Sequence, residues 1–104
     1  ASGAAAVQAL LAARPRPEAI FGGNDATALG ALFALQRAGV RVPQDMALAG
    51  FDDVPLAACT HPALTTVRVD LAALGAAATR VLLDDPDAPH VPGGLLPAPL
   101  VVRQ

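Results

Sequence analysis

The sequence predicts an α/β fold built on a parallel sheet. Three short apolar runs, at 19–23, 46–51 and 64–69, each end in one or two polar residues. Apolar runs of this length are typical of strands that are buried on both faces, as in parallel sheets. Segments with helical spacing of their apolar residues separate the runs, which is the pattern of βαβ units. Right-handed crossover connections are then expected.

The first half of the chain supplies two of the predicted helices. An Ala-rich helix is predicted over residues 2–14, with Ser2 as its N-cap and Pro15 just beyond its end. A second helix is predicted over about 26–38, between the first two strands, and Gly39 stands where such a helix stops. Its i, i+3, i+4, i+7 register is carried by Leu29, Leu32, Phe33 and Gln36.

The second half of the chain is predicted to contain two more helices and a final extended segment. A short helix is predicted from Pro55 to about residue 59, because Pro is tolerated in a first turn. A longer helix begins after Asp70 and runs to about residue 83. Residues 84–94 are rich in Asp, Pro and Gly and are predicted to form a solvent loop. Residues 95–102 contain two prolines that cannot donate to a sheet, so they form an edge strand or a crossing segment.

The composition argues against several classes of function. The 104 residues carry a formal net charge of −2 with no Lys, and the seven Arg residues are scattered, so no basic patch for nucleic acid is expected. No apolar run approaches the roughly 20 residues that a membrane span needs. The single cysteine, Cys59, excludes an internal disulfide, and His61 and His90 are too far apart for a metal-ligand spacing. Neither a cofactor nor a metal site is predicted.

Polar residues follow all three predicted strands. Asn24-Asp25 follows the first, Asp52-Asp53 the second, and Asp70 the third. Ligands of open α/β sheets collect beyond the carboxyl ends of the strands. Each polar residue also precedes a helix, where an N-cap must accept backbone N–H groups. Because two of the sites are doubled, one residue of each pair can cap while the other faces a ligand. Asn24 and Asp52 are predicted to be the free residues.

A set of motifs in a fixed order resembles one protein family. The motifs are Ala19-Ile20-Phe21 with Asn24-Asp25 and Ala28-Leu29-Gly30, Val42-Pro43-Gln44-Asp45, Gly50-Phe51-Asp52-Asp53, Pro62-Ala63-Leu64-Thr65-Thr66-Val67, Leu74-Gly75, and Leu96-Pro97 before Leu100-Val101-Val102-Arg103. With them, the chain resembles LacI/GalR-type transcriptional regulators in their periplasmic-binding-protein-like effector domain. The resemblance implies a three-layer lobe on a parallel sheet. In such a domain a small molecule, often a sugar or nucleobase, binds in a cleft between two lobes.

The resemblance also implies how much of such a regulator the chain contains. Residues 1–104 are expected to form a single partial domain, the C-terminal portion of the bilobal domain. The chain opens with a helix, whereas a parallel sheet normally supplies a strand first. The other lobe and the family's N-terminal helix-turn-helix are absent, so operator DNA is expected to be bound only through that absent part. The resemblance implies a cytoplasmic protein with no membrane contact.

The resemblance assigns site residues to individual positions. Asn24 and Asp52 match positions that hold effector hydroxyls, and a carboxylate beside an amide suits a polyol. Leu71 matches a position that packs on the apolar face of the ligand, and Asp25 is a further effector-binding candidate. Two positions depart from the sugar-binding relatives: Val69 stands where many carry Gln, and Leu71 is often aromatic there. A smaller or less polar effector, or a different way of holding it, is therefore also expected.

The family dimerises through two of the predicted helices. A likely self-association of this kind implies a homodimer interface that includes Leu29, Leu32, Phe33, Leu56 and Cys59. The alternative is that these side chains only face the sheet, and periodicity does not separate the two interpretations.

Three functions were compared on these grounds. The leading hypothesis is the sensing region of a bacterial repressor, whose lobes close on an effector and pass that closure to DNA-binding domains. The alternative is a periplasmic sugar-binding protein of a transport system, which shares the fold. An enzyme using Asp25, Asp52 and Asp70 is a third interpretation. It is disfavoured because no nucleophile–base pair or phosphate-cradling loop accompanies these residues. The chain is therefore not expected to be an enzyme.

Overall fold

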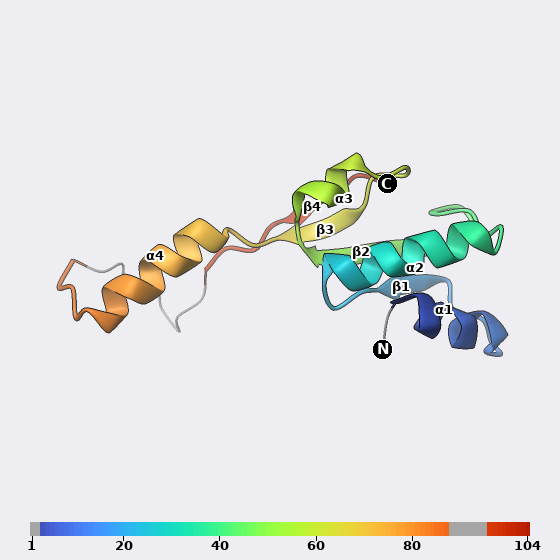
Figure 1. Cartoon of the computed structure of the whole chain (residues 1–104), viewed down its shortest axis with the longest axis horizontal. Coiled ribbons are helices and arrows are strands. Elements are labelled where there is room, and N and C mark those ends of the chain that lie inside the picture. The colour runs from blue at the N-terminus through green and yellow to red at the C-terminus, as the bar shows by residue number, and fades with distance from the viewer. Residues whose placement is uncertain (1–2, 88–95) are drawn as a thin grey trace.

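The computed structural model describes residues 3–87 and 96–104 and confirms the predicted α/β class (Figure 1). The elements are α1 (Gly3–Ala12), β1 (Ala19–Phe21), α2 (Asp25–Arg37), β2 (Ala47–Asp52), α3 (Pro55–Cys59), β3 (Thr65–Arg68), α4 (Leu71–Leu82) and β4 (Leu100–Val101). Each predicted element is present, and only the last strand is much shorter than expected. Ser2, the predicted N-cap, and most of the predicted loop at 84–94, with His90, lie outside the described residues.

The sheet has the spatial order β1-β2-β3-β4 and is mixed rather than wholly parallel. β1 pairs with β2 and β2 with β3 in parallel, as expected for βαβ units. β4 pairs antiparallel with β3, because the chain returns to the sheet from the far end of α4. The prediction of a parallel sheet is thus corrected for the edge strand alone. The extended segment before β4 also crosses back from α4, so both interpretations of residues 95–102 hold in part.

The core lies between one face of the sheet and α2, with α1 packed on α2. β2 alternates in burial, so Leu48 and Gly50 face the helices while Ala47 is exposed. The largest fully buried side chains include Leu32, Leu35, Met46, Leu64 and Val7. Burial of a large aliphatic side chain contributes about 1.5–3 kcal/mol, so this cluster is the main source of stability.

The opposite face of the sheet is uncovered by the described residues. Phe21 is 64% exposed, and a shallow groove on this face is lined by side chains of β1, β2, β3 and the C-terminal segment. The third layer that the fold class implies is therefore not formed by residues 3–87 and 96–104.

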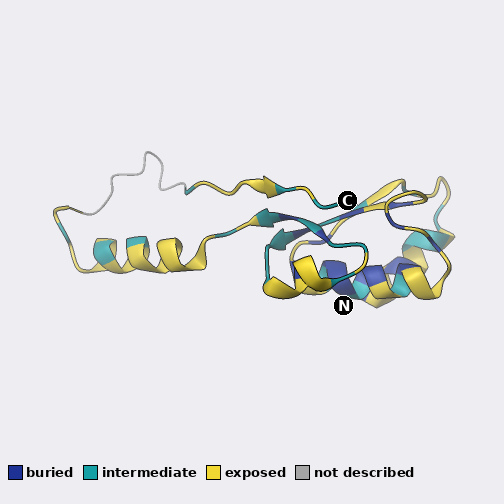
Figure 2. Cartoon of the chain, turned by 90° about the horizontal axis from the view of Figure 1, so that it is seen from above, coloured by how far each residue is buried: buried dark blue, intermediate teal, exposed yellow. Residues whose placement is uncertain are grey.

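Helix α4 extends away from the sheet, as Figures 1 and 2 show, and gives the molecule extents of 55 × 26 × 20 Å. No residue of α4 is buried, although its apolar side chains recur with helical period. Its exposed large side chains include Leu71, Leu74, Val81 and Leu82. Two connections join α4 to the sheet, residues 69–70 and the segment before β4. No helix among the described residues is long and apolar enough to cross a membrane.

The close approach of α2 to β2 predicts a specific effect of substitution at Gly50. A Cβ added there would collide with the Asp25 carboxylate and lie 3.1 Å from Leu64 Cδ2. Gly50→Ala should lower the free energy of unfolding by about 1–3 kcal/mol, as overpacking of a core does. Urea denaturation measures this loss. The matched control is Gly23→Ala, where a Cβ would have no neighbour within 4 Å. An equal loss in both variants would contradict the packing argument.

Candidate functional site

The candidate site lies at the carboxyl edge of β1 and β2. The register pairs Phe21 with Ala49, so positions 24 and 52 leave the sheet side by side three residues further on. Asp52 is itself paired with Arg68 of β3. The structure therefore brings the polar residues of three strands to one edge, as the order of the strands predicts.

Asn24 is the N-cap of α2. Its side-chain Oδ1 accepts a hydrogen bond from the Thr27 backbone N–H at 2.8 Å. The expectation that Asp25 caps this helix and leaves Asn24 free is wrong, because Asn is itself a preferred N-cap residue and Asp25 is directed inward. The exposed Asn24 keeps a partly free side chain, since its Nδ2 donates to no other described residue.

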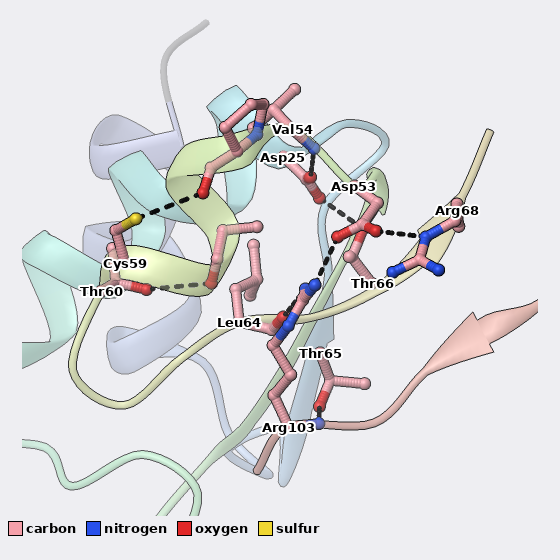
Figure 3. Close-up of polar contacts among 12 residues, drawn as sticks. Asp25, Asp53, Val54, Cys59, Thr60, Leu64, Thr65, Thr66, Arg68 and Arg103 are labelled. Atoms are coloured by element: carbon pink, nitrogen blue, oxygen red, sulfur yellow. Dashed lines mark hydrogen bonds and ion pairs between the residues drawn. The ribbon is translucent and has the colours of Figure 1, made fainter. Parts of the chain in front are cut away.

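Asp25 is fully buried and both of its carboxylate oxygens have partners in the chain (Figure 3). The Thr66 hydroxyl donates to Oδ1 at 2.6 Å, and the Val54 backbone N–H donates to Oδ2 at 2.8 Å. A buried carboxylate needs such donors to offset its lost hydration. This arrangement gives Asp25 a structural role in place of the predicted contact with an effector.

Asp52 carries the unoccupied carboxylate of the edge. Its side chain forms no hydrogen bond or ion pair with any residue in 3–87 or 96–104, and the residue is only half-buried. Its backbone has φ 113°, which a residue with a side chain rarely adopts. Strained backbone of this kind is concentrated at ligand sites. Asp52 is therefore free to accept hydrogen bonds from a ligand, as predicted from the doubled Asp pair.

Asp53 forms a double ion pair that the sequence did not indicate. Its side chain is 8% exposed, with Arg68 Nε at 2.6 Å from Oδ2 and Arg103 Nη2 at 2.7 Å from Oδ1. Hydrogen bonds from Arg68 and then Arg103 hold the pKa of Asp53 below its ordinary value. Arg103 also donates to the Leu64 carbonyl at 2.9 Å. The only available signal was the C-terminal motif that contains Arg103, and that motif did not identify its partner.

Leu71 lies away from the other candidate residues. It is the first residue of α4 and is 69% exposed. Asp70 caps this helix, because its Oδ1 accepts a hydrogen bond from the Ala73 N–H at 2.9 Å. A groove of about 420 Å³ runs between α4 and the segment before β4, and its lining includes Arg68, Asp70 and Leu74. The groove does not include Asn24, Asp52 or Leu71, so it is distinct from the predicted site.

The predicted interface residues divide into two groups. Leu29 and Leu32 are 5% and 0% exposed and belong to the core of the chain, which is the alternative that the sequence left open. Phe33 and Leu56 are 52% and 54% exposed, and Cys59 is an exposed free thiol. Only these three remain available to a second chain. Among residues 3–87 and 96–104 there is no group of His, Cys, Asp and Glu side chains that could hold a metal ion.

The Asp25 contacts predict a cost for removing one donor. Thr66→Val should lower the free energy of unfolding by about 1–3 kcal/mol, because it leaves a buried carboxylate oxygen without a hydrogen bond. Urea denaturation measures the change. Thr79→Val is the matched control, since the Thr79 hydroxyl donates to Gly75 O on the exposed helix α4. If Thr66→Val unfolds at the same urea concentration as the control, the Asp25 contact contributes nothing.

The lowered pKa of Asp53 predicts a pH dependence of stability. Because the folded pKa lies below the unfolded value of about 3.9, the unfolded chain binds more protons in acid. The stabilisation is fully present above that pH and is lost as pH falls through the lowered pKa. The difference in unfolding free energy between the wild type and Asp53→Asn should therefore be constant from about pH 5 to 8 and shrink below about pH 4. A difference that does not change on acidification would contradict the ion pairs.

Three comparisons place this chain among known proteins. The profile of the family described as periplasmic binding protein-like domain matches residues 1–104. The HTH-type transcriptional repressor PurR of Klebsiella pneumoniae (strain 342) is 46% identical over 83 residues, which are 80% of this chain and 24% of the repressor. This chain thus spans about a quarter of the length of that relative.

Two solved structures agree with this assignment. A LacI family transcriptional regulator from Lactobacillus casei with bound sucrose is 34% identical, with a TM-score of 0.83 over 98% of this chain and 38% of the regulator. A LacI family regulator from Arthrobacter sp. FB24 in complex with lactose is 35% identical, with a TM-score of 0.79 over 97% of this chain and 40% of the regulator. The chain therefore belongs to the periplasmic binding protein-like domain family, as part of an effector-binding domain of the LacI/GalR type.

Proposed function

We propose that the chain senses a small molecule for a bacterial transcriptional regulator and that Asp52 and Asn24 hold the effector. The observation that carries this proposal is the free carboxylate of Asp52 beside the free amide N–H₂ of Asn24 at one sheet edge. A carboxylate accepts hydrogen bonds from hydroxyls, and an amide N–H₂ donates them. A molecule with several hydroxyls, such as a sugar or a related metabolite, satisfies both groups.

The solved relatives support a sugar as the class of effector. Two regulators that are similar along almost the whole of this chain contain sucrose and lactose. Leu71 and Val69 favour a different mode of holding the molecule, because neither offers a flat stacking surface or a polar group. The PurR relative and these regulators also favour a regulator over the transport-linked binding protein that was the alternative. We propose binding without catalysis.

We further propose that effector binding controls DNA binding through closure of two lobes. Helix α4 carries an apolar face that the described residues do not cover, and two connections join it to the sheet. Its partner would be a second lobe in the longer regulator, and Leu71 would reach the effector from there. An effector that binds the closed arrangement more tightly shifts the population toward it.

The same proposal assigns the partners of the longer regulator. Operator DNA would be bound by a domain outside this chain, and the protein would therefore act in the cytoplasm. A homodimer would use Phe33, Leu56 and Cys59, which the core leaves exposed.

Asp52→Ala tests the site in the full-length regulator. A thermal-shift screen against lactose, sucrose, other sugars, polyols and nucleobases should identify compounds that raise the Tm of the wild type, because they bind only the folded state. Asp52→Ala should weaken binding of such a compound at least tenfold, since it removes the acceptor, and should leave operator binding intact. Asp87→Ala is the control, with an exposed carboxylate far from this edge along the chain. An undiminished Tm increase in Asp52→Ala would reject the assignment.

A further inference from the structure

We propose that Asp53 is the positioning residue of the effector site, which sets the backbone of Asp52 and anchors both connections to α4. This inference rests on the proposed function for its consequence, although the anchoring is a property of the chain itself. Figure 3 shows the Asp53 carboxylate between Arg68 and Arg103, with the buried Asp25 nearby.

The backbone at Asp52 and Asp53 requires an external restraint. Both residues have positive φ, 113° at Asp52 and 57° at Asp53. Non-glycine residues persist in such conformations only where the surrounding structure holds them. The nearest restraints are the two ion pairs of Asp53 and the hydrogen bond from the Val54 N–H to Asp25. The direction in which Asp52 presents its carboxylate therefore depends on the side chain that follows it.

The two arginines belong to the two connections. Arg68 is the last residue of β3, immediately before residues 69–70 lead to α4. Arg103 follows β4, on the segment that returns from α4. The connections are also joined directly, since the Arg68 N–H donates to the Pro99 carbonyl at 2.8 Å. One carboxylate thus contacts both chain segments through which α4 can move relative to the sheet.

This geometry couples the site to the connections. The Val69 N–H donates to the Asp52 carbonyl at 3.4 Å, so the first connection also touches the effector-binding residue. A displacement of either connection changes the position of an arginine, and through Asp53 it acts on the backbone of Asp52. An effector held by Asp52 acts on the connections by the same contacts. Asp53 thereby transmits, and does not itself bind.

Hydrogen exchange of the full-length protein tests the anchoring without any effector. In Asp53→Asn the amides of Arg68 and Val69 should exchange about tenfold faster or more, because their local opening is no longer restrained. The Gly22 amide, which donates to Ala49 O at 2.8 Å within the sheet, should keep its rate. Equal acceleration at all three amides, or none at Arg68 and Val69, would overturn the proposal, since it would indicate a general loss of stability or no restraint.

Two further variants keep the test decisive. Asp45→Asn removes a carboxylate from the exposed pair of Asp45 and Arg41, 2.6 Å apart, and should leave exchange at Arg68 and Val69 unchanged. Arg68→Gln removes one arm of the anchor at a side chain that is 55% exposed, so it should fold even if Asp53→Asn does not. It should accelerate exchange at Val69 while Gly22 stays protected. An unchanged Val69 rate in Arg68→Gln would overturn the anchor.

Titration with lactose and sucrose separates this inference from the proposed function. If the wild type binds either sugar, Asp53→Asn should raise its Kd about tenfold at a temperature where the variant is folded, while Asp45→Asn should not. An unchanged Kd in Asp53→Asn would overturn the positioning role. If the wild type binds neither sugar, the proposed sugar class fails, and the exchange rates still decide whether Asp53 anchors the connections.

Discussion

The arrangement of this chain depends on one buried carboxylate. Asp25 lies at the start of α2, accepts hydrogen bonds from Thr66 on β3 and from the backbone of Val54, and is fully buried. A charge in the core is tolerated only where donors surround it. The contacts therefore fix α2, the end of β2 and β3 relative to one another, and they require glycine at position 50, where a side chain would occupy the carboxylate's place.

The orientation of Asp25 determines what its neighbours can do. Because Asp25 points inward, Asn24 is left to cap α2, and it uses its carbonyl oxygen for that purpose. Because Asp25 also holds Val54, the chain turns sharply after β2 and directs Asp53 toward the arginines of β3 and the C-terminal segment. Asp52 is the one carboxylate of these pairs that the described residues leave without a partner. The free acceptor at the sheet edge is thus a consequence of the buried one.

Local signals in the sequence were sufficient for the elements but not for the division of roles. Periodicity and turn residues located the helices and strands, since these depend on neighbours in the chain. The assignment of the cap failed because the donor that draws Asp25 inward is Thr66, 41 residues away. The anchor of Asp53 on Arg103 spans 50 residues and left no local trace. Leu29 and Phe33 share a helix and a residue type, yet only packing shows that one is buried and the other exposed.

A sheet edge alone provides hydrogen bonds without enclosure. Small-molecule sites bury most of their ligand's surface, and here the same edge carries only one free acceptor and one partly free donor. Exclusion of water from those contacts requires a second wall, and α4 is the part of this chain that extends toward one, with its apolar face uncovered. If affinity arises mainly when the second wall meets the first, the effector necessarily favours the closed arrangement. Ligand binding and movement about the two connections then become the same event, and the residue that touches both connections, Asp53, lies where the two are coupled.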